Sequence, residues 1–502
     1  MSITLTPIEA QICDLLTTVV ERIHEQQPKE PRLVLRIAGG WVRDKLLGLE
    51  SHDVDIAIDH MNGYELAQHV NQYLQDTGHP TRTVAKITQN PERSKHLETA
   101  TTSVLGLLVD FVNLRSETYN GDSRIPNVAF GTPLEDALRR DITINALFYN
   151  IHTREVEDFT GKGLEDLKAG VIRTPLDPFK TFTDDPLRVL RVLRFASRFS
   201  YEIDKETSEA MGRMEIKEDL DRKISRERVG VELEKMAGGP HPLLSIQLIL
   251  RFGLYLDIFR PPPTTTWLDP ATTIDEPLAA HLTGHVFDLL ERNTEILDCL
   301  SGYPRIDADP QAQRSLMLAA YLYPFRHVQV TDRKRNVPVT QVIIRDGLKL
   351  ANSDIDTTLA LHQLADQITQ MAGSCMKGEL SRCQLGLQIR VAGTRWPMAV
   401  IFAAAVEMLK SGNGVDARLV DMFGGFVRRV KEENLGEAYL FKHLVDGKAV
   451  AKLLGIKPGP GIKDVLDRVM EWQLANPEGT KEQCEVFIRE EIAPGILPQK
   501  KK

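Results

Sequence analysis

The chain carries Gly39-Gly40-Trp41-Val42-Arg43-Asp44-Lys45-Leu46 and, a short distance further on, Asp53-Val54-Asp55-Ile56-Ala57-Ile58. The apolar residues 33–37 precede the glycines and predict a buried strand. Gly39 and Gly40 let the backbone turn sharply and approach a ligand, and a helix beginning at Trp41 would direct its free amide groups at the same spot. Arg43, one turn into that helix, could add a charge-assisted hydrogen bond. This first motif therefore predicts a phosphate site.

The second motif alternates with the two-residue period of a strand. Asp53 and Asp55 then share one face, while Val54, Ile56 and Ile58 fill the other. Two carboxylates on one face can hold hard cations such as Mg²⁺, and two such ions about 3.5–4 Å apart promote nucleotidyl transfer. Alone, an Asp-x-Asp is more typical of a solvated strand end. Following a glycine turn at this spacing, it indicates a metal-dependent phosphoryl or nucleotidyl transferase.

The composition is that of a soluble globular protein. The chain has 502 residues, 42% hydrophobic and 26% charged, which suffices for two to four domains. We expect no membrane span, because no window approaches about 20 consecutive apolar residues, and no secretory signal. Five cysteines without a Cys-x-x-Cys pair favour a reducing compartment. A net charge of −8 argues against indiscriminate nucleic-acid coating but permits local basic surfaces.

The pattern of apolar residues divides the chain into an α/β part and a helical part. Residues 8–26 read as an amphipathic helix, and strand-like and helical runs alternate from Leu33 to about Asn150. Beyond Gly161 the strand signals largely disappear, and glycine and proline punctuate long helical patterns. We therefore expect a head over residues 1–158, a helical neck over 159–240, and a helical body and tail over 241–502.

Further polar residues of the head are candidates for the same site. Asp110 lies within an apolar strand-like run, where it is either a satisfied half-buried acid or a third carboxylate beside the first two, as a metal ligand or as a base. Asp141 and Asn145 stand one turn apart on an expected helix, beside Arg139 and Arg140. They could bind sugar hydroxyls while the arginines neutralise a triphosphate; the alternative is a solvated charged helix start.

Residues 184–198 predict a helix with one cationic face. Pro186 suits the first turn, and four arginines spaced by three or four residues form a stripe opposite an apolar arc: Arg188, Arg191, Arg194 and Arg198. A cationic stripe is usually a solvated surface. Here Asp185 and Arg188 can meet at i and i+3, presenting an acceptor beside a donor fork that could pair with cytosine or adenine.

Taken in order, these segments resemble the class II tRNA nucleotidyltransferase and bacterial poly(A) polymerase family, over roughly residues 33–240, and the C-terminal half resembles eukaryotic, particularly fungal, members. The resemblance implies an α+β fold with a polymerase-beta-like nucleotidyltransferase head, a mixed sheet with helices, followed by an all-helical neck, body and tail. It also implies two Mg²⁺ ions on Asp53 and Asp55 and nucleotide binding by Gly39, Gly40, Arg43, Arg139, Arg140, Asp141, Asn145, Asp185, Arg188, Arg191 and Arg194. Arg124, in the polar loop 116–126, would help to switch addition from C to A.

The expected reaction is template-independent addition of C, C and A to the 3′ end of tRNA from CTP and ATP, with release of pyrophosphate. A CC-only or A-only enzyme and a poly(A) polymerase share nearly every motif, and a non-catalytic RNA-binding protein is the alternative of another class. The expected partners are tRNA and the two nucleotides, with no membrane and no protein partner. We expect an intracellular protein, cytoplasmic or nuclear, with a mitochondrial form arising from an alternative start.

Overall fold

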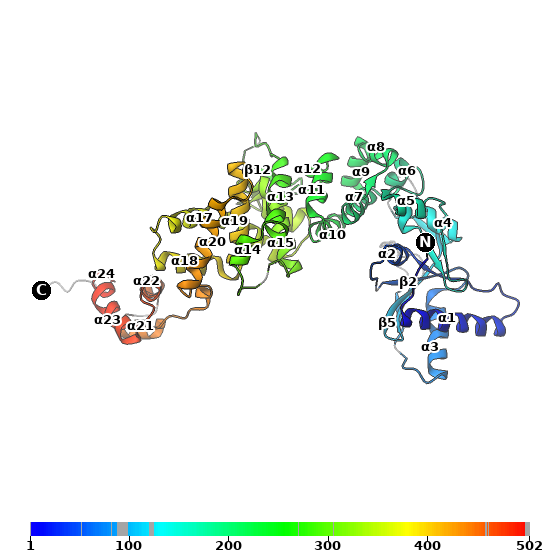
Figure 1. Ribbon diagram of the computed structural model, residues 1–502, viewed down its shortest axis with the longest axis horizontal. Coiled ribbons are helices and arrows are strands. Elements are labelled where there is room, and N and C mark those ends of the chain that lie inside the picture. The colour runs from blue at the N-terminus through cyan, green and yellow to red at the C-terminus, as the bar shows by residue number, and fades with distance from the viewer. Residues whose placement is uncertain are drawn as a thin grey trace. The chain divides into compact units, whose positions relative to one another are not determined.

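A seven-stranded mixed sheet organises the N-terminal part of the chain in this computed structural model (Figure 1). The structure describes residues 2–51, 53–81, 83–87, 99–119, 125–269, 271–304, 306–456, 459 and 461–496. The chain divides into two compact units, residues 1–258 and 259–502.

The sheet of the first unit has the strand order β3-β4-β5-β2-β1-β8-β9. Strands β2 and β5 run parallel, and every other neighbouring pair with described register is antiparallel. The strands are β1 (Leu35–Ala38), β2 (Val54–Ile58), β3 (Ala85–Ile87), β4 (Thr99–Val104), β5 (Leu107–Asn113), β8 (Phe148–Asn150) and β9 (Glu155–Glu157). This is the mixed sheet expected of the head.

Strand β2 shows the predicted alternation. Val54, Ile56 and Ile58 are buried on one face, and Asp55 on the other face is only half-buried. The parallel register of β2 and β5 pairs Asp55 with Asp110. Adjacent strands lie about 4.8 Å apart, so this register brings two carboxylates to the same edge of one face.

The helices α1 (Pro7–Gln26), α2 (Gly40–Leu46), α3 (Gly63–Asp76) and α4 (Pro133–Leu138) belong to the head. Helix α1 spans the segment predicted to be helical. Thr6 and Glu9 form its capping box, which satisfies amide groups left open at the helix start. Helix α3 packs against β4 and β5.

The neck positions the cationic stripe. Its elements are α5 (Gly163–Ala169), α6 (Pro178–Asp184), α7 (Leu187–Phe199), α8 (Lys205–Met211), α9 (Met214–Lys223) and α10 (Arg226–Ala237), with the parallel pair β10 (Val171–Ile172) and β11 (Glu202–Ile203). Helices α11 (Pro242–Arg251) and α12 (Tyr255–Ile258) lie beyond the predicted neck, in the segment expected to begin the body, but they belong to the same compact unit. Helix α7 buries Val189, Leu190 and Leu193 and packs against α10 and α11. This apolar contact fixes which way the opposite, arginine-bearing side of α7 points.

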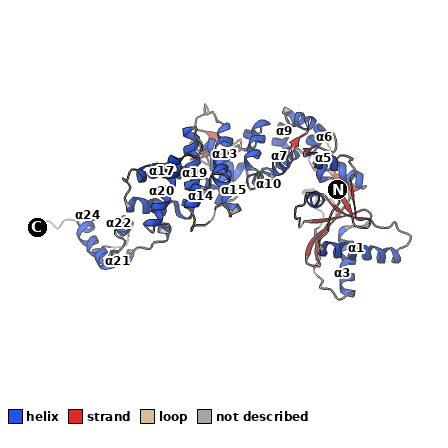
Figure 2. Ribbon diagram, viewed as in Figure 1, coloured by secondary structure: helices blue, strands red, loops and turns tan. Residues whose placement is uncertain are grey.

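The second unit is mostly helical, as Figure 2 shows. Its longer helices are α13 (Pro277–Glu291), α15 (Pro310–Tyr321), α17 (Asn352–Met376), α18 (Arg382–Ala392), α19 (Trp396–Ser411), α20 (Ala417–Glu432) and α22 (Gly461–Ala475), and its shorter ones α14 (Glu295–Cys299), α16 (Val339–Val342), α21 (Gly447–Leu454), α23 (Lys481–Phe487) and α24 (Ala493–Ile496). The expected all-helical remainder was too simple. Besides β10 and β11, a small antiparallel sheet is formed by β12 (Thr266–Trp267), β13 (Gln329–Asp332) and β14 (Arg335–Pro338).

One helical stretch, Arg382–Ser411, is long and apolar enough to cross a membrane by length and composition. It comprises α18 and α19 with the short turn Gly393–Arg395 between them, and Gly393 has a φ of +59°. Of its apolar window, 67% is buried inside the protein. Helix α19 packs against α13 and α17, so these residues form part of the core of the second unit.

The polar segment after Arg115 begins with a strand that its composition did not predict. Strands β6 (Arg115–Thr118) and β7 (Asn127–Phe130) pair as an antiparallel ladder. The sequence alone suggested a connection without a rigid element there. Arg124 lies outside the described residues.

Candidate active site

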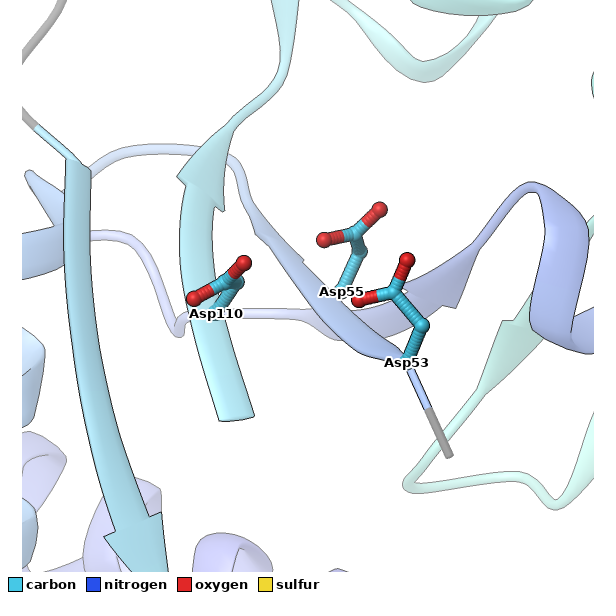
Figure 3. Close-up of side chains that lie close together, drawn as sticks. All are labelled: Asp53, Asp55 and Asp110. Carbon is cyan, nitrogen blue, oxygen red and sulfur yellow. The ribbon is translucent and has the colours of Figure 1, made fainter. Parts of the chain in front are cut away.

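Three carboxylates gather at one edge of the sheet (Figure 3). Asp53 lies just before β2, Asp55 within it, and Asp110 on the neighbouring β5. One oxygen of each lies within 4.8 Å of an oxygen of the others. Thr101 on β4 donates a hydrogen bond of 2.5 Å to Oδ1 of Asp110, which fixes the orientation of that carboxylate. The predicted pair on one face is thus joined by the third acid.

The three carboxylates repel one another, and this repulsion affects the titration of Asp55. Burial is the main cause that raises the pKa of Asp55 to about 6, and the charges of Asp53 and Asp110 raise it further, against the opposing effect of Arg140. Three hard oxygen donors that repel one another are the ligand set suited to a divalent cation.

A pocket of about 690 Å³ opens beside Asp55. It is large enough for a nucleoside triphosphate and falls within the usual range of small-molecule sites. Its walls come from the head and the neck. They include Gly40, Arg43, Asp55, Glu117, Tyr119, Arg139, Arg140, Asp141, Asn145, Asp185, Arg188, Arg191, Arg194 and Arg198. With the exceptions of Gly39, Asp53, Asp110 and Arg124, every predicted site residue therefore lines this one pocket.

The glycine turn lies directly beside the arginine pair. Gly39 has a φ of +76°, which side chains disfavour, and a Cβ at this position would lie 2.6 Å from Nη1 of Arg140. Arg140 donates to the main-chain oxygen of Asn145 at 3.1 Å. Helix α2 starts at Gly40, and the buried guanidinium of Arg43 donates to the side-chain oxygen of Asn145 and to Asp44. The side chain of Arg43 is therefore oriented by protein contacts.

The segment with Asp141 and Asn145 is not the predicted regular helix. Asp141 lies in a bend, and only Thr143–Asn145 form a 3₁₀ turn. The two side chains still meet, because Nδ2 of Asn145 donates to Oδ1 of Asp141 at 3.1 Å. Burial would raise the pKa of Asp141, but Arg191, bound at 2.7 Å, and the bond from Asn145 lower it to about 2.

The two adjacent arginines share one buried acid. Asp136 of α4 accepts from Arg139 at 2.5 Å and from Arg140 at 2.9 Å. Arg139 also lies 3.3 Å from Glu117 of β6. Asp136 is 1% exposed and held ionised by both guanidinium groups, which lower its pKa although burial opposes them. Asp136 thereby holds both arginines at the pocket wall.

Asp185 and Arg188 lie at the start of α7, but each binds a different partner. Arg188 donates to the main-chain oxygen of Arg139 at 2.5 Å and to the hydroxyl of Tyr119 at 3.4 Å. The carboxylate of Asp185 accepts from Arg228 of α10 at 2.9 Å. In place of the direct pairing with Asp185 that helical spacing suggested, Arg188 contacts Arg139 and Tyr119, which follow α4 and β6. Asp185 contacts α10 instead.

The rest of the cationic stripe is bound to acids. Glu232 of α10 lies 3.6 Å from Arg191 and 2.5 Å from Arg194, and Arg198 lies 3.4 Å from Asp44. Glu232 is 3% exposed. The stripe is therefore a set of oriented side chains on the pocket wall rather than a fully solvated surface.

Sequence reasoning missed several lining residues, among them Glu117, Tyr119, Arg228 and Glu232. Arg228 and Glu232 stand at i and i+4 on α10, so they share a helix face and that spacing could have singled them out. Glu117 and Tyr119 stand two residues apart at the end of β6, which only a strand assignment would have revealed.

A mixed sheet with three clustered carboxylates beside a cationic, nucleotide-sized pocket defines a nucleotidyltransferase of the polymerase-beta type. Residues 35–173 match the family described as "Poly A polymerase head domain", and residues 200–266 match "Probable RNA and SrmB-binding site of polymerase A". The "CCA tRNA nucleotidyltransferase, mitochondrial" of Saccharomyces cerevisiae is 40% identical, covering 99% of this chain and 94% of the relative. The chain belongs to the tRNA nucleotidyltransferase and poly(A) polymerase family.

Solved structures agree with this fold. Complexes of a CCA-adding enzyme with ATP and with CTP match the chain with TM-scores of 0.64 and 0.63. They cover 99% and 97% of this chain and 96% of each solved chain, at 20% sequence identity. The similarity extends over both units, so the family architecture spans the helical half as well as the head.

Proposed function

We propose that this enzyme adds C, C and A to the 3′ end of tRNA, using CTP and ATP and releasing pyrophosphate. The observation that carries the proposal is that one pocket is lined both by Asp55 of the carboxylate cluster and by Asp185 and Arg188 at the start of α7. The full-length similarity to the S. cerevisiae enzyme supports tRNA as the acceptor.

In this reaction the terminal 3′-hydroxyl of the tRNA attacks the α-phosphorus of the nucleotide. The bond to the β-phosphate breaks, and pyrophosphate leaves. Two Mg²⁺ ions held by Asp53 and Asp55 would activate the attacking oxygen and stabilise the leaving one. Asp110 accepts the proton of the hydroxyl through the carboxylate oxygen that Thr101 leaves open.

The remaining contacts orient the nucleotide. Arg43, Arg139 and Arg140 place positive charge along the triphosphate, and Gly39 gives the phosphates close access to the backbone. Asp141 and Asn145, joined by their hydrogen bond, bind the ribose hydroxyls. Asp185 accepts from the amino group that cytosine and adenine both carry, while Arg188 donates to the neighbouring acceptor atom. Arg191 and Arg194 face the phosphates.

The localisation is part of the same proposal. The name of the S. cerevisiae protein supports a mitochondrial form. Cytoplasmic and nuclear forms belong to the same proposal.

Extension of a tRNA transcript that lacks its 3′ CCA tests the activity. The assay contains Mg²⁺ and CTP, ATP, UTP or GTP alone, or CTP with ATP, and is read at single-nucleotide resolution. We expect two additions from CTP and three, followed by a stop, from CTP with ATP. A stop after two additions in the mixture would mean a CC-only enzyme, and a long A ladder would mean a poly(A) polymerase. A second transcript that ends in CC is tested in parallel, and addition of A to this transcript alone would mean an A-only enzyme. tRNA binding without extension would leave an RNA-binding protein.

A further inference from the structure

The hairpin of β13 and β14 in the second unit has an unusual turn. Asp332 pairs with Arg335, which leaves only Arg333 and Lys334 between the strands. Their φ angles are +46° and +68°. A two-residue hairpin turn with two positive φ angles favours Asn-Gly or similar pairs, because long side chains are strained in this region. Two cationic residues therefore occupy positions that turn geometry alone would give to other residues.

The tip of this hairpin is strongly cationic. Arg333, Lys334 and Arg335 are consecutive and exposed. Residues 332–349 contain five cationic and two acidic side chains, which gives this segment a net charge of +3 in a chain of net charge −8. Among the described residues, no ion pair holds Lys334 or Arg335. This concentration of charge is opposite in sign to the protein as a whole.

The two neighbouring acids are already engaged. Arg345, in the π-helical turn Ile343–Gly347, binds Asp332 at 2.7 Å and Asp346 at 2.5 Å. The first bond ties the base of the hairpin tip to the turn that follows α16. Arg345 thus neutralises two acids that would otherwise offset the positive charge of the tip, and it links the base of the tip to the turn. Short π-helical segments of this kind are frequent at functional sites.

We propose that Arg333, Lys334 and Arg335 form a phosphate-binding tip that contacts the sugar–phosphate backbone of the substrate tRNA. The inference rests on the proposed function for the identity of the RNA. A polyanion must overcome the overall negative charge of this protein, and a fixed cluster of exposed cations supplies that attraction and releases counter-ions from the RNA. Base sequence is not read here, because the contacts are made with phosphates.

The double variant R333N/K334G tests the tip. It removes two charges while installing the pair that this turn geometry prefers, so its thermal midpoint should equal or exceed that of the unchanged enzyme. Fluorescence anisotropy of labelled tRNA, without nucleotide, should show a dissociation constant roughly 10-fold higher near 0.1 M salt. The slope of log affinity against log salt should become shallower by about 2. The KM for CTP at saturating tRNA should not change.

Two controls separate charge from folding. R333K/K334R keeps both charges and should bind tRNA as the unchanged enzyme does. Arg335→Gln alters a strand position without touching the turn, so it should weaken tRNA binding by itself and reduce the salt slope by about 1. If both charge-removing variants bind tRNA normally at every salt concentration, the proposal is overturned. An acidic protein surface is then the remaining candidate partner of the tip.

Failure of this inference is distinguishable from failure of the proposed function. If the protein adds no nucleotide but its tRNA binding depends on the charges of the tip, the proposed activity is refuted and the tRNA-binding role of the tip stands. If the tip variants add CCA normally and bind tRNA with unaltered affinity, the proposed activity stands and the tRNA-binding role of the tip is refuted.

Discussion

The guanidinium of Arg188 on α7 donates a 2.5 Å hydrogen bond to the main-chain oxygen of Arg139 and a longer one, 3.4 Å, to the hydroxyl of Tyr119. Tyr119 in turn donates to Glu117 at 2.8 Å. Arg188, the neck side chain that we propose reads the base, is thus oriented by the head and by the end of β6. The orientation of Arg188 depends on contacts that are far apart in the sequence.

Tyr119→Phe should loosen Arg188 without removing its charge. Loss of one long hydrogen bond costs about 1 kcal/mol, so we expect KM for CTP and ATP to rise by roughly 5-fold and kcat to change less. Steady-state addition to matched tRNA transcripts measures both constants. Tyr149→Phe, in β8 and outside the pocket, is the control and should leave KM unchanged. Equal constants for Tyr119→Phe and the unchanged enzyme would show that the hydroxyl has no positioning role.

Asp55→Asn should abolish addition while the protein stays folded. The substitution removes a ligand charge from the carboxylate cluster, which is expected to cost at least about 100-fold in rate. Repulsion from Asp53 and Asp110 also falls, so the thermal midpoint without metal should not decrease. Asp59→Asn, just beyond β2 and bonded to the amide of Val34, is a matched control with retained activity. Comparable activity in the two variants would refute the catalytic assignment.

Glu232, which lines the pocket, should also stabilise the folded protein. Glu232→Ala leaves Arg194, 8% exposed, without its partner at 2.5 Å, and breaking such a buried pair costs about 3 kcal/mol. Denaturant unfolding of the first unit should report this loss. Glu232→Gln keeps a hydrogen-bond acceptor and should recover much of it, while Glu234→Gln on the exposed side of α10 is the control. A Glu232→Ala protein as stable as the control would contradict the role of the pair.

His362 in α17 should make the second unit sensitive to mild acid. Burial lowers the pKa of this imidazole to about 4; it packs between Tyr323 and Phe402, and Nε2 bonds to the main-chain oxygen of Ala319 at 2.8 Å. The unfolded chain, with a pKa near 6.5, takes up the proton first. Stability is therefore complete above pH 6.5 and falls as the pH drops toward 4, by about 2 kcal/mol between pH 7 and 5.

The substitution His362→Gln should flatten that dependence, because glutamine keeps a donor for Ala319 and does not titrate. Unfolding free energies at pH 7 and 5 measure the effect. His281→Gln, at an exposed position of α13, should leave the dependence intact. An undiminished pH dependence in His362→Gln would assign the acid sensitivity to other groups.

Much of the secondary structure of the head was predictable, because it depends on sequence patterns within short segments. The alternation from Val54 to Ile58 predicted β2, and the capping pattern around Thr6 accompanies a helix predicted within two residues of its observed start. Where local rules compete, the prediction failed. Asp141 and Asn145 have helical spacing, yet Thr143 takes the main-chain oxygen of Arg173 and the side chain of Asp166 as partners, and the segment forms a bend and a 3₁₀ turn.

Residue types and spacing alone were enough to indicate a carboxylate pair, a glycine turn and an arginine stripe, since strand and helix periods dictate which side chains share a face. The tertiary structure decided which distant residues complete them. The register of β2 and β5 brings Asp110 to Asp55, and the packing of α7 on α10 brings Glu232 to Arg194. These pairings depend on the packing of apolar faces from separate segments, and no local period of the chain encodes that packing.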